Sequence, residues 1–60
     1  MHALSADQLR ERARDLVARL GEGALTFAEW KADVLEEAGR LEEASVWKMI
    51  AGTVMAMIET

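Results

Sequence analysis

Three segments of the chain carry apolar residues at the i, i+3 and i+4 spacing that is typical of one helix face. In the first segment they are Leu9, Ala13, Leu16, Val17 and Leu20. In the second they are Phe27, Trp30, Val34, Leu35 and Ala38. In the third they are Ala44, Trp47, Ile50, Ala51, Val54, Met57 and Ile58. The pattern predicts an all-α fold, a compact three-helix bundle with helices at about residues 6–20, 27–38 and 41–59.

The first two segments begin with the same capping pattern. Ser5 with Gln8, and Thr26 with Glu29, have the spacing of a capping box, in which two side chains satisfy two free amides of a helix start. Each box is bracketed by an apolar pair, Leu4 with Leu9 and Leu25 with Trp30. The pattern predicts that these two helices begin directly after Ser5 and Thr26.

Glycines mark where the first two helices end. Gly21 and Gly39 suit the left-handed backbone that often follows a helix. One or two residues after Gly39 suffice to begin the next helix, which predicts a tight antiparallel hairpin of the last two helices in a single domain, residues 1–60. The residues predicted at the centre of the bundle are Leu16, Phe27, Trp30, Val34, Trp47, Ile50 and Val54.

The third segment is more apolar than a core-facing helix requires. Residues 49–58 include no charge, and the apolar residues of this helix span an arc of roughly 180°, against about 100° for an ordinary core face. Either this is the central helix, covered on both sides, or part of it contacts another molecule. For the second case the candidate interface is Met49, Gly52, Met55, Ala56, Met57 and Ile58.

Four carboxylates lie on one side of the second helix. They are Glu29, Asp33, Glu36 and Glu37. Such a face either keeps a small protein soluble or docks on a basic surface of a partner. The chain has no loop with the oxygen-rich spacing of a calcium site, so we expect no metal.

The length and composition of the chain limit how stable its fold is without a partner. The chain has 60 residues, no cysteine and no proline, with a net charge of −4. A chain of this length buries only about 60% of its unfolded surface, and association is one way to add stability. The longest apolar run is about half the ~20 residues that a membrane-spanning helix needs. We therefore expect a cytoplasmic protein with no membrane contact.

Enzymatic and nucleic-acid-binding functions are not expected. The single histidine is His2, and no nucleophile with a base can be assembled. The arginines of the first helix alternate with acids, and the acidic second helix repels phosphates. We expect no cofactor and no small-molecule substrate.

Two short resemblances are present. Residues 38–44 (Ala-Gly-Arg-Leu-Glu-Glu-Ala) resemble the hairpin junction of tetratricopeptide repeats, but the larger residues of that repeat are missing at Ala28 and Lys31. Ala38-Gly39 followed by Trp47-Lys48-Met49-Ile50-Ala51 is similar to a pattern in short uncharacterised proteins of alphaproteobacteria. The second resemblance implies a bacterial, intracellular three-helix protein of no known activity.

The sequence favours a non-catalytic protein–protein interaction module, a homo-oligomer or a binder of another protein. Self-association through the apolar face of the helix at 41–59, with a dimer favoured, is the first hypothesis. The alternative is a small acidic inhibitor or decoy from a mobile element, which docks on a basic partner through the helix at 27–38.

Overall fold

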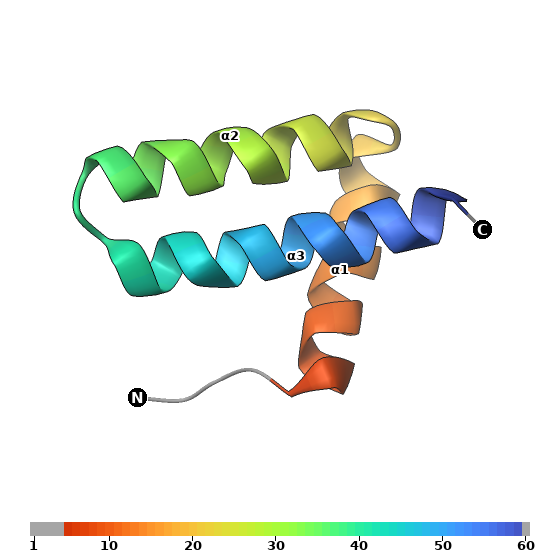
Figure 1. Cartoon of the computed structure of the whole chain (residues 1–60). Helices are drawn as coiled ribbons and strands as arrows, with labels where there is room; N and C mark the ends of the chain where they lie inside the picture. The colour runs from red at the N-terminus through yellow and green to blue at the C-terminus, as the bar shows by residue number, and fades with distance from the viewer. Residues whose placement is uncertain (1–4, 60) are drawn as a thin grey trace.

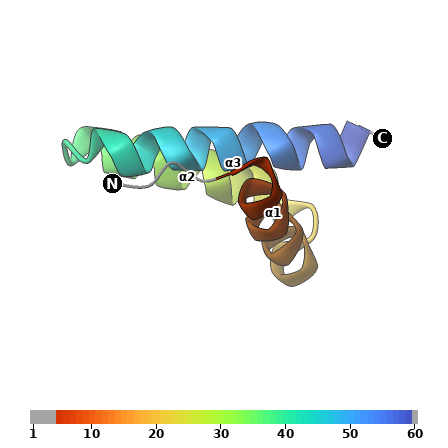
Figure 2. The same cartoon turned by 90° about the horizontal axis from the view of Figure 1, so that it is seen from below.

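The protein consists of an antiparallel helical hairpin with a third helix packed across one side of it. A computed structural model describes residues 5–59 and contains α1 (Ala6–Leu20), α2 (Gly23–Glu37) and α3 (Leu41–Glu59). Helices α2 and α3 lie side by side, and α1 crosses them steeply (Figure 1). Seen from below, α1 lies on one side of the layer that α2 and α3 form (Figure 2). The predicted three-helix bundle and its hairpin are confirmed.

α3 is the central helix of the bundle. It packs against both α2 and α1, and these two contact each other less than either contacts α3. α3 therefore has the central position of the first explanation, but Met49, Met55 and Ile58 stay exposed and are not covered. The second explanation, a contact with another molecule, concerns the part of that face that stays exposed.

The first predicted capping box is present. The backbone N–H of Gln8 donates to Ser5 Oγ at 3.2 Å, and the backbone N–H of Ser5 donates to Gln8 Oε1 at 2.9 Å. These two bonds satisfy two of the free amides at the start of α1. Leu4, the outer residue of the first apolar pair, lies outside the described residues.

The predicted start of the second helix is wrong. α2 begins at Gly23, so Thr26 lies inside its first turn, and the N-cap is Glu22, whose side chain makes no capping bond. Gly21 (φ 57°, ψ −127°) and Glu22 (φ −63°, ψ −22°) have the angles of a type II′ turn. This turn reverses the chain within two residues, and Ala24 is then fully buried in the first turn of α2.

The hairpin turn between α2 and α3 is a Schellman motif. Gly39 has φ 81°, its amide donates to the Glu36 carbonyl at 3.1 Å, and the Arg40 amide donates to the Leu35 carbonyl at 2.8 Å. Gly39 therefore has the predicted role. The helix itself ends at Glu37, one residue before the predicted end.

Alanine makes up most of the buried core. The buried residues are Ala13, Ala24, Ala28, Ala32, Leu35, Ala44, Ile50, Ala51 and Val54. The predicted positions of Ile50 and Val54 are confirmed. Leu16, Phe27 and Trp47 are only half-buried.

Two predicted core residues are exposed. Trp30 is 55% exposed and Val34 is 41% exposed, so their assignment to the core is wrong. Ala24, Ala28 and Ala32 recur every four residues and form the buried stripe of α2, which lets this helix lie close to its neighbours. Of the larger apolar residues of α2, Leu35 is buried, whereas Phe27, Trp30 and Val34 lie outside the stripe and are half-buried or exposed.

Candidate functional site

Exposed apolar residues of α3 form a continuous strip, here called the methionine stripe: Met49, Gly52, Met55 and Ala56. Met49 is 44% exposed and Met55 is 42% exposed. Met49, Gly52 and Ala56 border an open groove of about 660 Å³ between α3 and α1, and Gly52 and Met55 border a second hollow of about 580 Å³ between α3 and α2. Four of the six residues of the predicted interface thus share one exposed surface.

Gly52 has no packing role within the described chain. A Cβ atom built on it meets no other atom within 4 Å. Glycine nevertheless costs about 1 kcal/mol relative to alanine inside a helix. The close approach that a glycine permits is therefore not used by residues 5–59.

The other two residues of the predicted interface border the methionine stripe. Met57 is half-buried, packs against the core and lines the same groove. Ile58 is 53% exposed and lies three residues after Met55, about 60° from it around the helix. Met57 contributes mainly to the core, and Ile58 lies at the edge of the stripe.

The acidic face of α2 contains three carboxylates without an ion pair and one that is paired. Glu29, Asp33 and Glu37 are exposed and make no ion pair within residues 5–59. Glu36 Oε2 lies 2.6 Å from Lys48 Nζ of α3. This hydrogen bond and the charge of Glu36 raise the pKa of Lys48 above 10.5. In the described part of the chain, no group of three or more His, Cys, Asp or Glu residues is placed to hold a metal ion.

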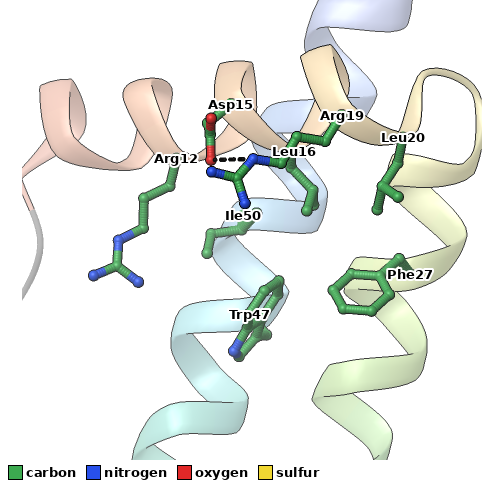
Figure 3. Close-up of a pocket in the computed structure, with 8 residues that line it drawn as sticks. All are labelled: Arg12, Asp15, Leu16, Arg19, Leu20, Phe27, Trp47 and Ile50. Atoms are coloured by element: carbon green, nitrogen blue, oxygen red, sulfur yellow. Dashed lines mark ion pairs between the residues drawn. The ribbon is translucent and has the colours of Figure 1, made fainter.

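A third surface is an aromatic notch on the opposite side of α3 from the methionine stripe. It has a volume of about 490 Å³. Its lining residues are Arg12, Asp15, Leu16, Arg19, Leu20, Phe27, Trp47 and Ile50. Figure 3 shows that α1 forms one wall, while Phe27 of α2 and Trp47 and Ile50 of α3 form the floor.

Three aromatic residues form a connected group at the notch. The Phe27 ring lies edge-on to Trp47, with 5.7 Å between centroids and 76° between planes. Trp30 lies 5.8 Å from Phe27 and extends the apolar surface outward. Contacts of this geometry favour association of the rings beyond the area that they bury.

The sequence pattern does not predict this notch, because it predicts that Phe27, Trp30 and Trp47 lie in the core. The signal that was available is the four-residue spacing of Ala24, Ala28 and Ala32. Three small residues on one helix face indicate a close helix contact there. Phe27 and Trp30 lie about 100° and 160° from Ala28 around the helix, so they point away from that contact.

Comparison of the chain with protein-family models, with curated proteins and with solved structures finds no match in any of the three. The resemblance of residues 38–51 to alphaproteobacterial proteins stays a prediction. Within residues 5–59, no helix has the length and apolar character that crossing a membrane requires. The exposed apolar and aromatic residues indicate an interaction surface for a protein partner.

Proposed function

We propose that the protein is a non-catalytic interaction module of the bacterial cytoplasm that self-associates through the methionine stripe. The observation that carries this proposal is Gly52, a mid-helix glycine with open space beside it and exposed methionines at Met49 and Met55. Its cost to the helix is offset if a second helix packs closely against it.

The stripe has the composition of a close helix–helix contact. Gly52 and Ala56 have the small-xxx-small spacing that lets two helix backbones approach, a relation best known in membrane helices. Methionine side chains adapt to the surface that they meet. A symmetric dimer places Gly52 of both copies near the crossing point, because a two-fold interface uses the same patch twice.

A dimer interface of ordinary size needs more surface than the methionine stripe of α3 provides. An ordinary stable interface buries about 800 Å² per partner, roughly a fifth of the 4390 Å² that this chain exposes. The four stripe residues alone are too few for that area. The groove beside them adds Leu9, Arg10 and Arg14 of α1, which complete the surface that a second copy covers.

The test is sedimentation equilibrium over about a hundredfold range of protein concentration. We expect a mass of twice the 6.6 kDa chain at the upper end. Gly52→Leu should give the single-chain mass with unchanged helix content by circular dichroism. Ala18→Leu, at an exposed position of α1, is the control and should leave the dimer intact.

Two results count against self-association. One is a single-chain mass at every concentration. The other is a dimer that Gly52→Leu leaves unchanged, which moves the interface away from the stripe.

The acidic face supports a second candidate, an inhibitor from a mobile element that docks on a basic partner. Its support is a set of three exposed carboxylates: Glu29 and Glu37, which have no ion pair within residues 5–59, and Asp33, whose charge also acts on Lys48. Reversing these three to lysine should abolish binding to such a partner and leave the mass in solution unchanged. Glu36 is left intact in this test because it holds Lys48.

A further inference from the structure

We propose that the aromatic notch docks an acidic amphipathic helix of a second protein. This goes beyond self-association, because the notch and the methionine stripe lie on different faces of α3. Trp47 and Gly52 are about 140° apart around that helix. A molecule bound at one surface leaves the other accessible.

The shape of the uncovered surface fits a helix. α3 has 19 residues and is about 28 Å long, whereas a packed helix such as α1 covers a width of about 10 Å. Figure 1 and Figure 2 show α1 crossing nearer the C-terminal half of α3, so no helix of residues 5–59 covers the N-terminal half on that side. The notch continues in that direction through a smaller hollow lined by Arg12, Glu43, Val46 and Trp47. A helix beside α1, at the usual axis separation of about 8–10 Å, rests on this surface.

The residues of the floor are of the kind that anchors a bound helix. Phe27 and Trp47 are half-buried and fixed by their ring contact, while Trp30 and Val34 beside them are exposed. Aromatic residues dominate the binding energy of many protein interfaces. The partner helix therefore presents a stripe of large apolar side chains to this floor.

Among the charged residues that line the notch and the smaller hollow, Arg12 is the one without an ion pair within residues 5–59. The two carboxylates are already engaged: Asp15 Oδ2 lies 3.3 Å from Arg19 Nε, and Glu43 is paired with Arg40. Within residues 5–59, the Arg12 guanidinium makes no ion pair and the Trp47 indole N–H has no acceptor. Figure 3 shows Arg12 extended away from the Asp15–Arg19 pair. Carboxylates beside the apolar stripe of the partner supply the missing acceptors.

The test measures the binding of a defined peptide to the whole protein by fluorescence anisotropy. The probe is a fluorescein-labelled, alanine-based helical peptide of about 16 residues, with leucines at i, i+4 and i+7 and glutamates on both flanks. One matched peptide has lysine for every glutamate, and another has alanine for every leucine. We expect the acidic peptide to bind at least about fivefold more tightly than the lysine peptide, as expected for one exposed ion pair.

Variants of the notch locate the site. Arg12→Glu should weaken the acidic peptide about fivefold and strengthen the lysine peptide. Trp30→Ala should weaken the acidic peptide about tenfold, and it preserves the fold because this side chain is exposed. Both arginine substitutions are made in the Gly52→Leu background, so that an effect on self-association does not enter the comparison. Arg14→Glu is then the matched control, because Arg14 also lacks an ion pair within the described residues but lines the groove on the other side of α1. It should change neither affinity by more than about twofold, because salt largely screens exposed charges that are not in direct contact.

Three outcomes overturn the proposal. They are equal affinities of the acidic and lysine peptides, equal effects of Arg12→Glu and Arg14→Glu on the affinity of the acidic peptide, or an alanine-substituted peptide that binds as tightly as the acidic peptide with its leucines. Sedimentation separates this proposal from the proposed function. If Trp30→Ala reduces the mass in solution, the notch is filled by a second copy of this chain, which also overturns it. Peptide binding by the Gly52→Leu variant should equal that of the native chain, whether or not the chain forms dimers.

Discussion

Two residues of α2 have roles opposite to those that their sizes suggest. Ala28 is fully buried, while Trp30, two positions later, is 55% exposed. A large side chain in place of Ala28 has no space between α2 and its neighbours. A small one in place of Trp30 loses mainly the ring contact with Phe27.

We expect Ala28→Leu to lower the free energy of unfolding by about 1–3 kcal/mol, because overfilling a packed core forces strain. Trp30→Ala should lower it by only about 1 kcal/mol, the value of an aromatic pair. Urea denaturation of both variants measures the two free energies of unfolding and shows whether Ala28→Leu causes the larger loss. The reverse order would mean that Trp30 belongs to the core.

The ion pair between Lys48 and Glu36 makes part of the stability depend on alkaline pH. Since Glu36 raises the pKa of Lys48 above 10.5, the folded chain holds this proton more strongly than the unfolded chain does. The contribution is fully present below pH 10.5 and is lost as the pH rises through the folded-state pKa of Lys48. The stability difference between the native chain and Glu36→Gln should therefore shrink in that range.

Thermal unfolding of both chains from neutral pH to strongly alkaline pH measures this difference. Asp15→Asn is the control, because Asp15 pairs with Arg19, which stays charged throughout. Its stability difference should stay constant. A Glu36→Gln difference that also stays constant would show that the pair does not stabilise the fold.

At the scale of elements, two glycines have opposite effects. Gly39 holds a left-handed backbone that ends α2, whereas Gly52 lies in regular helix with open space around it. Gly39→Ala should cost about 1 kcal/mol or more, because an L-residue is strained there. Gly52→Ala should stabilise the single chain by about 1 kcal/mol.

Thermal unfolding in dilute solution, where association is minimal, tests both substitutions. The two shifts in melting temperature should have opposite signs. A loss of stability for Gly52→Ala in the single chain would show that something within the chain packs against this residue.

At the scale of the whole molecule, association makes stability depend on concentration. A chain that dimerises only when folded melts at a higher temperature as its concentration rises. We expect this rise for the native chain and for Ala18→Leu, and no rise for Gly52→Leu. A concentration-independent melting temperature for all three would indicate that the exposed apolar residues serve a different partner.

The number of helices and most of their ends follow from local signals. Ser5 with Gln8 begins α1, and Gly21 and Gly39 end the first two helices, because these effects involve only a few adjacent residues. The orientation of α2 about its axis does not follow in this way. It depends on how closely the helices approach, and that distance is a property of two helices together.

The methionine stripe and the aromatic notch also differ in how far the sequence predicts them. The methionine stripe follows from residues of one helix, so the sequence identified Met49, Gly52, Met55 and Ala56. The notch requires three helices and the crossing position of α1. Arg12 and Trp47 are 35 positions apart, and no spacing rule connects them.

Because most core residues are alanines, the side chains with the most conformational freedom lie on the surface. Alanine has no rotamers to lose on folding, so closing α2 onto α3 immobilises few side chains. The rotamer-rich residues Met49 and Met55 are outside and keep their freedom until they bind something. The interior that holds the helices together is thus rigid at little entropic cost, and the exterior is free to adapt. Substitutions on the outer surfaces can change the preferred partner while the fold stays the same.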